Sequence, residues 1–409
     1  MSGLAEEQAE ELFRQVAAFA SFGFNKSHKS HAAAFARTAY ESAFLKLYYP
    51  AQFTAGLVNH QPMGFYPVEV LVNDAKRHGV AVLPVDLNRS RYRTTTEWVG
   101  MPGEPLPEGS GIDRRPPVVR SSGCVVPDGR ARWQLAAEPA QGYGVRLGLH
   151  LVKVIGEEHA ERLDEELGRG PYRSLADVVA RTGLAEEVVE RLIRAGALDS
   201  LGRPRRELLW QLREVAASTG RQTMGRARPA QTAIPLDLRL PPTEAPELPP
   251  PSELERLADS YAILSLDARR QVVELFRPTL ERLGARPIAR LSEHPPGRVR
   301  IGGLVVTRQH PMTARGTVFL ALEDETGMAN VTLWPDTWVR LRSVVRRHAL
   351  LLVEGQLQRE GAVVNLVARG VWPLPEMARG VGGPGRPAGV RQLGYAGTRG
   401  RRDAGTRRG

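Results

Sequence analysis

The fold class is decided by residues 297–373, which run GRVRIGGLVVTRQHPMTARGTVFLALEDETGMANVTLWPDTWVRLRSVVRRHALLLVEGQLQREGAVVNLVARGVWP. Apolar and polar residues alternate there in five runs separated by turn residues, which predicts strands over 298–308, 317–323, 329–334, 349–357 and 363–371. The segment 335–346 has helical spacing instead. Five strands with a helix between the third and the fourth is the order of an OB-fold, a small barrel that we expect over 297–374.

An OB-fold barrel binds single-stranded nucleic acid by stacking bases on aromatic side chains along a basic groove. We place four residues near such a groove: Arg308, Arg315, Phe319 and Trp334. The two aromatic residues have a second interpretation, since their side chains could equally fill the barrel core. The run Asp324–Gly327 between the second and third strands predicts a turn rather than a metal site.

The composition changes on both sides of the barrel. Residues 252–296 have helical spacing and predict a helical connector, whereas 218–251 are rich in Pro, Thr and Ala and predict a linker that buries too little surface to fold. Residues 375–409 are rich in Gly and Arg and predict a disordered basic tail. The length of 409 residues also suits several modules, since a domain takes roughly 100–200 residues.

Residues 144–217 predict two helix-hairpin-helix units in tandem. Val154-Ile155-Gly156 leads into one helical pattern, and Thr182-Gly183-Leu184 leads into another. Glycine at such a turn lets the backbone N–H groups of a helix N-terminus bind a phosphate without reading base sequence. A purely structural role stays open, because such turns also occur in ordinary helical bundles. The candidate phosphate-binding residues are Lys153, Gly156, Arg162, Arg191 and Arg194.

The charge of the chain favours a polyanionic partner. Lys and Arg exceed Asp and Glu by eleven, which makes nucleic acid the leading candidate, although an Arg-rich genome could give the same excess. The single cysteine, Cys124, cannot form an internal disulfide, and we find neither an export signal nor an apolar run long enough to span a membrane. We therefore expect a cytoplasmic protein without a membrane partner.

The sequence lacks a recognisable catalytic centre. A template-directed polymerase holds two Mg²⁺ ions about 3.5–4 Å apart between clustered carboxylates, and we find no such cluster. A phosphate-cradling Gly-rich loop, a nucleophile elbow and an HExxH motif are also missing. We therefore assign no catalytic residue and no metal ligand to this chain.

Two sets of motifs resemble one protein family. The first set comprises Phe22-Gly23-Phe24-Asn25-Lys26-Ser27-His28, His31-Ala32-Ala33-Ala34-Phe35-Ala36, Gln61-Pro62-Met63-Gly64-Phe65-Tyr66-Pro67 and Asp74-Ala75-Lys76-Arg77-His78-Gly79-Val80. It closely resembles the fingers region of error-prone polymerases of the DNA polymerase III alpha-subunit type. The second set, Gly302-Gly303-Leu304-Val305, Leu322-Glu323-Asp324-Glu325-Thr326-Gly327 and Trp334-Pro335, resembles the OB domain of that family. The resemblance spans about residues 5–374 but covers only the C-terminal part of a typical member.

The resemblance implies a multidomain, mainly α-helical chain that ends in an all-β, five-stranded OB-fold barrel. Residues 1–90 would be a partial fingers domain and 91–143 a loop-rich connection to the hairpin units. The family's PHP domain and its palm, with the Asp residues that bind Mg²⁺, would lie before Met1. We therefore expect this chain to bind no cofactor and to be inactive as a polymerase on its own.

The fingers motif also implies a site near the incoming nucleotide or the primer-template. Its candidate residues are Asn25, Lys26, Ser27, His28, Lys29 and His31. Lys26-Ser27-His28 is repeated at once as Lys29-Ser30-His31, whereas the family pattern has one such triplet. Three extra residues come close to one helical turn, so the helix face could be nearly restored.

The resemblance implies a role in DNA replication and repair, as the part of an error-prone polymerase that binds single-stranded template and primer-template duplex during translesion synthesis after DNA damage. Its expected partners are a separately encoded palm and PHP half and other mutasome proteins. Gln271–Phe276 also resembles peptides that dock on the bacterial sliding clamp, although one face of a helix explains it as well. A stand-alone DNA-binding protein and a non-functional gene fragment stay open as alternatives.

Overall fold

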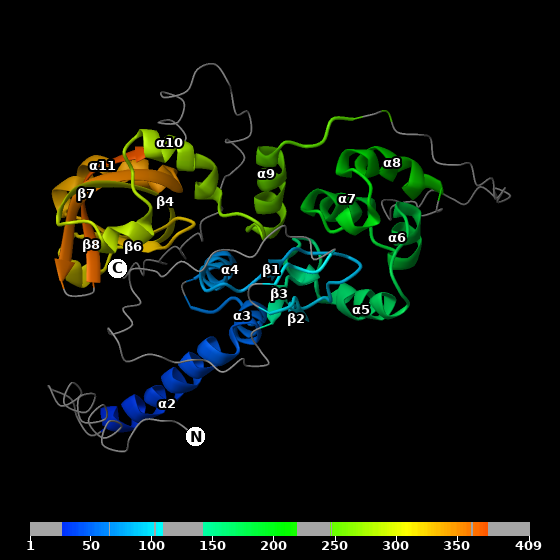
Figure 1. Ribbon diagram of the computed structural model, residues 1–409, viewed down its shortest axis with the longest axis horizontal. Coiled ribbons are helices and arrows are strands. Elements are labelled where there is room, and N and C mark those ends of the chain that lie inside the picture. The colour runs from blue at the N-terminus through cyan, green and yellow to red at the C-terminus, as the bar shows by residue number, and fades with distance from the viewer. Residues whose placement is uncertain are drawn as a thin grey trace, which may run out of the picture.

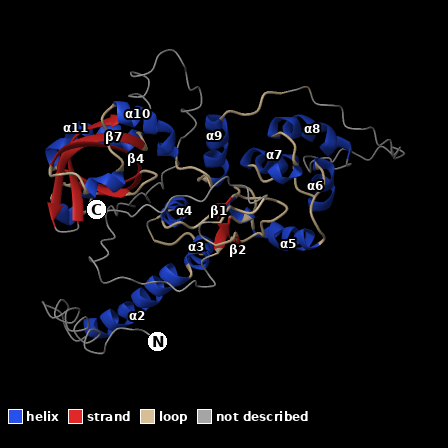
Figure 2. Ribbon diagram, in the orientation of Figure 1, coloured by secondary structure: helices blue, strands red, loops and turns tan. Residues whose placement is uncertain are grey.

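The structure is a computed structural model that describes residues 27–64, 66–101, 104–108, 142–218, 246, 248–360 and 363–374. Figure 1 shows a β-barrel at one end, a group of helices at the other, and a small sheet with two helices between and below them. A long N-terminal helix, α2 (Ser27–Tyr48), projects away from both parts. Figure 2 shows that strands are concentrated in the barrel, while helices dominate the rest. The mainly α-helical fold with a C-terminal barrel is therefore confirmed.

The described part of the chain contains further α-helices after α2 and several short 3₁₀ helices. The α-helices are α3 (Pro50–Asn59), α4 (Val68–Arg77), α5 (Ala160–Gly168), α6 (Leu175–Thr182), α7 (Glu186–Ala195), α8 (Arg205–Ser218), α9 (Glu253–Leu264), α10 (Arg277–Arg282) and α11 (Pro335–Arg347). Short 3₁₀ helices lie at Leu149–Leu151, Glu157–His159, Asp199–Leu201, Val272–Phe276, Ile288–Ser292 and Met312–Ala314.

Local sequence explains several helix ends. Ser252 caps α9, because its hydroxyl accepts a hydrogen bond from the N–H of Glu255 while the Glu255 carboxylate accepts one from the N–H of Ser252. The helices α6 and α7 both end at glycines with positive φ, Gly183 at 64° and Gly196 at 83°. A side chain at either position would strain the backbone, so glycine ends both helices at low cost.

A small sheet joins the N-terminal helices to the hairpin region. Its strands are β1 (Val82–Leu83), β2 (Thr95–Trp98) and β3 (Tyr143–Arg146), in the order β1-β3-β2. The strand β3 runs parallel to β1 and antiparallel to β2. The segment 91–143, which the sequence predicts to be loop-rich, thus contributes one complete strand and the first residue of another.

One apolar core runs through the helices and the small sheet. It joins buried residues of α3 and α4, of β1 and β3, of the hairpin helices and of α9, from Ala51 to Ala268. We refer to this part, residues 50–101 and 142–268 as far as they are described, as the helical body. Because its segments share a core, the hairpin units cannot be separated from the N-terminal helices without exposing apolar surface.

The barrel is closed and has the strand order expected from the sequence. Its strands are β4 (Gly297–Gln309), β5 (Val318–Glu323), β6 (Met328–Leu333), β7 (Leu350–Glu360) and β8 (Val363–Pro373), arranged β4-β5-β6-β8-β7. The contact between β6 and β8 is parallel and the others are antiparallel. The helix α11 connects β6 to β7 and packs Leu341 and Val344 against the barrel core. The predicted OB-fold is confirmed.

Buried polar contacts join the barrel to the helical body. The guanidinium Nη1 of Arg77 in α4 lies 2.6 Å from Oε1 of Glu323 at the end of β5, and the side-chain amide of Asn73 donates to Oε2 at 3.2 Å. Glu323 is fully buried, and burial raises the pKa of its carboxyl against the opposing effect of Arg77. A buried carboxylate needs such partners, so this contact fixes the barrel on α4.

The predicted turn at Asp324–Gly327 is present and is itself held in place. One carboxylate oxygen of Asp324 accepts hydrogen bonds from the N–H groups of Thr326 and Gly327, at 2.8 and 2.9 Å. The other accepts from Arg277 of α10 at 2.9 Å and from the N–H of Ile288 at 2.9 Å. Asp324 therefore binds protein donors on both oxygens, which fits the turn interpretation.

Candidate nucleic-acid interface

The fingers residues singled out from the sequence lie at the beginning of the described chain. Asn25 and Lys26 fall outside the described residues, while Ser27, His28, Lys29 and His31 lie in the first turns of α2. Further along, α2 exposes a series of large apolar side chains: Phe35, Tyr40, Phe44, Leu45 and Leu47. A water-soluble helix normally buries one apolar stripe, whereas these side chains are exposed on more than one side of α2, so the helix has apolar surface suited to a partner.

The first hairpin turn is docked on the end of α9. Val154 has a φ of 87°, Ile155 is buried, and Gly156 precedes the 3₁₀ turn that leads into α5. The Lys153 ammonium donates to the carbonyl oxygen of Ala262 at 2.7 Å, and its backbone N–H donates to the carbonyl of Ile263 at 3.1 Å. A short 3₁₀ turn, not a longer helix, precedes this hairpin, so its geometry departs from the expected unit.

The other hairpin cations also have partners within the protein. Arg191 lies 2.8 Å from the carboxylate of Glu187, and Arg194 lies 2.8 Å from that of Glu190. Each pair is one helical turn apart on α7, the spacing at which opposite charges meet. Arg162 of α5 donates to a backbone carbonyl, that of Arg181, at 3.1 Å. The structure thus places these cations on the surface but gives them intramolecular contacts.

The barrel gives its candidate aromatic residues a different environment. Phe319 of β5 is 39% exposed, and Trp334, which immediately precedes α11, is 55% exposed. Their neighbours Leu320 and Leu333 are buried in the barrel core. The structure therefore excludes the core interpretation of the two aromatic residues and leaves both rings accessible to a ligand.

The two candidate arginines of the barrel have distinct roles. Arg308 donates to the carbonyl oxygens of Val345 and His348, both at 3.0 Å, and so satisfies carbonyl groups at the end of α11. Arg315 is exposed, has a φ of 48° and lies in the connection between β4 and β5. Among the described residues, Arg315 forms no ion pair with a carboxylate.

The structure adds residues that the sequence prediction missed. His310 in the β4–β5 connection and Trp338 of α11 have ring centroids 6.1 Å apart, and the Arg346 guanidinium lies 5.5 Å from the Trp338 centroid. Arg342 lies on the same helix, one turn before Arg346, and is exposed. The signal for these residues was a predicted helix that contains several arginines and, in Asp336, one carboxylate.

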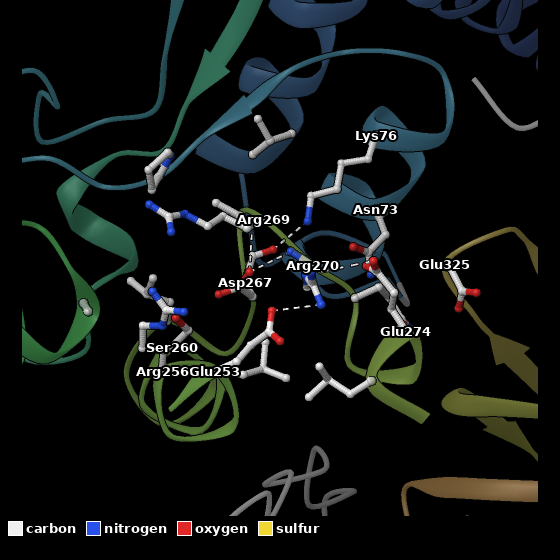
Figure 3. A pocket seen from close by; sticks show the side chains of 18 of the residues that line it. Asn73, Lys76, Glu253, Arg256, Ser260, Asp267, Arg269, Arg270, Glu274 and Glu325 are labelled. Carbon is white, nitrogen blue, oxygen red and sulfur yellow. Dashed lines mark hydrogen bonds and ion pairs between the residues drawn. The ribbon is translucent and has the colours of Figure 1, made fainter. Parts of the chain in front are cut away.

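A cavity of about 400 Å³ lies where α4, α9 and the segment 267–275 meet. Figure 3 shows its charged side chains facing one another. The Lys76 ammonium donates to the backbone carbonyl of Asp267 at 2.7 Å, and burial lowers the pKa of Lys76. Arg270 pairs with Glu253 at 2.8 Å. Because these charges are paired with protein groups, we assign no ligand to the cavity.

Neither a metal centre nor a membrane span emerges from the described ranges. No group of three or more His, Cys, Asp or Glu side chains there is placed to hold a metal ion. The described helices include none that is long and apolar enough to cross a bilayer.

Two family descriptions match this chain. Residues 79–208 match the helix-hairpin-helix motif, and residues 299–374 match the OB-fold nucleic acid binding domain. Among solved structures, the Stn1–Ten1 complex of S. pombe covers 21% of this chain and 66% of its own at 16% identity. Its TM-score of 0.19 is too low to support an argument.

Curated relatives extend over nearly the whole chain. The error-prone DNA polymerase of Anaeromyxobacter sp. strain K is 37% identical over 375 residues, which are 91% of this chain and 29% of the relative. Those of Corynebacterium efficiens and Burkholderia pseudomallei are 38% and 37% identical, over 91% and 93% of this chain and 29% and 31% of the relatives. The chain thus spans less than a third of their length. Nine-tenths of it is similar to the C-terminal part of the error-prone DNA polymerases, and it combines a helix-hairpin-helix motif with an OB-fold.

Proposed function

We propose that this chain is the DNA-holding part of an error-prone DNA polymerase that acts in translesion synthesis and repair. Its substrates would be single-stranded template and primer-template duplex. The observation that carries the proposal is the exposure of Phe319 and Trp334 on an OB-fold barrel whose β4–β5 connection carries Arg315, a residue with no acidic partner among the described residues. Exposed aromatic rings together with such a cation suit base stacking with a backbone contact.

The proposal locates the main single-strand contact on the barrel rather than on the hairpins. The cations of α7 already pair with glutamates, and Lys153 holds the end of α9. A phosphate would have to displace these contacts before it could gain from the charges. The hairpins would still offer backbone N–H groups to duplex DNA, which is a weaker and sequence-independent contact.

The test is binding of the purified chain to a fluorescent single strand and to a primer-template. Replacing both Phe319 and Trp334 by Ala should weaken single-strand binding by at least tenfold, since each stacked base contributes about 1–3 kcal/mol. Trp210→Ala is the matched control, because Trp210 is similarly exposed, at 42%, but lies on α8 of the helical body. This control should leave the single-strand affinity within about twofold of the wild-type value.

The outcomes separate the candidate roles. If binding is salt-sensitive and the double variant weakens it, the result supports a DNA-holding role. Nucleotide incorporation in the same tubes would contradict our expectation that the chain does not polymerise DNA alone. Binding to neither DNA would contradict the proposal and favour a non-functional fragment. Full DNA binding, with no gain in incorporation on adding a palm-containing polypeptide, would favour a stand-alone DNA-binding protein.

The exposed side chains of α2 support a protein partner. Tyr40, Phe44 and Tyr48 lie one turn apart, with centroid distances of 6.5 and 4.5 Å between successive rings. We propose that a polypeptide carrying the palm and PHP domains covers this face and supplies the carboxylates that bind Mg²⁺. Other mutasome proteins would join the same assembly, and a cytoplasmic location suits a chain with one cysteine.

The clamp-like peptide at Gln271–Phe276 receives less support. It forms a 3₁₀ helix in which Val272 and Val273 are buried, and Gln271 is buried as well. The Gln271 side chain accepts a hydrogen bond from the N–H of Val273 at 2.6 Å. A clamp could reach these residues only after local unfolding, so we do not propose this segment as a clamp contact.

A further inference from the structure

The outer face of α11 has an unusual concentration of positive charge. Arg342, Arg346 and Arg347 are all exposed, and none of them forms an ion pair with a carboxylate of the described residues. Arg342 and Arg346 are one turn apart, a spacing at which like charges destabilise a helix by a few tenths of a kcal/mol. The arrangement therefore costs the isolated protein stability.

Other arginines on helix surfaces show how this cost is usually avoided. In the helical body, Arg203 lies just before α8 and 3.4 Å from Glu207, one turn further along the chain. Arg169 lies just after α5 and 2.6 Å from Glu166, one turn back along the chain. The pairs of α7 follow the same rule. The acidic residue of α11 is Asp336, at its first turn, and it pairs with none of the three arginines. The charge of α11 is thus available to an anion from outside.

This charged face lies on the helix that follows Trp334, one of the two aromatic residues of the proposed single-strand site. The β4–β5 connection lies against the start of the helix, since a Cβ added at Gly316 would lie 3.6 Å from Pro335. The same connection brings His310 to Trp338, whose ring lies under Arg346. A strand stacked on the exposed rings could therefore continue along α11.

We infer that the outer face of α11 binds the phosphodiester backbone of a single strand where it leaves Phe319 and Trp334. Arg342, Arg346 and Arg347 span about 7.5 Å of helix axis at 1.5 Å per residue. A stacked strand with the B-DNA spacing of about 3.4 Å per nucleotide presents two or three phosphates over that length. Each guanidinium can bind a phosphate through two N–H groups. This inference rests on the proposed function, because it extends the same binding site.

The test compares a short and a long oligothymidylate, of about six and about twenty nucleotides, over a salt series with the full chain. Each phosphate contact to a single strand contributes about 0.7 to the salt slope. Replacing the three arginines of α11 by Gln should therefore lower the slope for the long oligonucleotide by about 2. At 100 mM salt, affinity for it should fall about 10- to 100-fold, while the short one should bind unchanged within about twofold.

The matched control is Arg37→Gln, Arg203→Gln, Arg290→Gln, which removes three exposed cations that pair with glutamates. It should leave the slope unchanged. Thermal unfolding of both triple variants shows whether either has lost its fold, which is not expected for exposed side chains.

The outcomes distinguish the inference from the function on which it rests. If the wild-type chain binds neither oligonucleotide, the proposed function fails. If it binds both and the α11 variant keeps the wild-type slope, the function stands and the inference is overturned. Vesicles containing phosphatidylserine provide the third arm of the test. If the chain binds them only when the α11 arginines are present, while the DNA salt slope does not depend on these arginines, the face binds an anionic lipid surface and the inference is overturned.

Discussion

The helix α7 of the helical body, and α11 with the β4–β5 connection, use arginine in opposite ways, although the barrel also pairs Arg300 with Glu354. On α7 of the body, Arg191 and Arg194 each lie one turn after a glutamate and pair with it. On the barrel, Arg315, Arg342 and Arg346 have no acidic partner in the part of the chain that the structure describes. The same side chain therefore stabilises one region and is held ready for an anion in the other. Net charge cannot reveal this difference, because it counts both kinds equally.

The largest effect is expected where an arginine of the body is buried. Arg77→Met should destabilise the protein by about 3–5 kcal/mol, because it leaves the fully buried Glu323 carboxylate without its cation. Urea unfolding at pH 7 measures this loss. Arg37→Met is the control, since Arg37 is highly exposed on α2 and the variant should unfold at nearly the same urea concentration as the wild type.

The pH dependence of that variant provides a second check. Burial raises the pKa of Glu323, so the folded state takes up a proton more readily than the unfolded state. A protonated Glu323 needs no guanidinium, and without Arg77 its pKa should rise further. The stability loss in Arg77→Met should therefore shrink as the pH falls from 7 towards 4. A loss that stays constant over this range would contradict the role we assign to the pair.

Arg181 should show the next largest effect, again on stability alone. Its guanidinium donates to the Glu166 carboxylate at 3.1 Å and to two backbone carbonyls, and it lies 4.2 Å from the Tyr172 ring centroid. Arg181→Ala should cost about 2–3 kcal/mol in urea unfolding. DNA affinity, corrected for the folded fraction, should not change. Arg173→Ala, an exposed neighbour, is the control, and equal losses in the two variants would refute the assignment.

Arg315 should show the reverse pattern. Arg315→Ala should lower the salt slope of single-strand binding by about 0.7, which corresponds to loss of one phosphate contact. Melting temperature should stay within a few degrees, because Arg315 is exposed and alanine keeps the same Cβ at this positive φ. The variant Arg315→Lys keeps the positive charge and should therefore restore most of the salt slope. A slope that stays low in the lysine variant would show that the contact needs the guanidinium group and not only a positive charge.

The smallest effect is expected for the cations of the predicted hairpin site. Arg191→Ala with Arg194→Ala should change single-strand affinity by less than about twofold and stability by less than about 1 kcal/mol, since both are exposed surface pairs. Fluorescence anisotropy measures the affinity, and low salt is the most demanding condition for this comparison, because charges are least screened there. A tenfold loss of affinity there would show that DNA displaces the glutamates, and the distinction between the two regions would fail.

The sequence was most informative where local pattern determines structure. Alternation between 297 and 373 predicted the five strands and the helix of the barrel, because each strand has one face in the core and one in solvent. The turn predicted at Gly183 is present, and its positive φ of 64° is one that glycine adopts without strain. Burial of Phe319 or Trp334 could not be decided, since an aromatic residue suits either face of a strand.

Contacts between segments far apart in the chain could not be predicted from the sequence. The pairing of Arg77 with Glu323 joins residues 246 positions apart, and Lys153 meets Ala262 across 109 positions. The local pairs on α7 could have been predicted, because glutamates stand four residues before both arginines in the sequence. Counting such i,i+4 carboxylates would have favoured the arginines of α11 over those of α7 as phosphate contacts.

Photo-crosslinking tests the central claim most directly. A single strand with photoreactive thymidine analogues is bound to the full chain, irradiated, and the crosslinked peptides are identified by mass spectrometry. We expect crosslinks at Phe319 and Trp334 and along α11 from Arg342 to Arg347, with few in residues 150–200. Crosslinks concentrated at the hairpin turns around Gly156 and Gly183, with none on the barrel, would contradict the account.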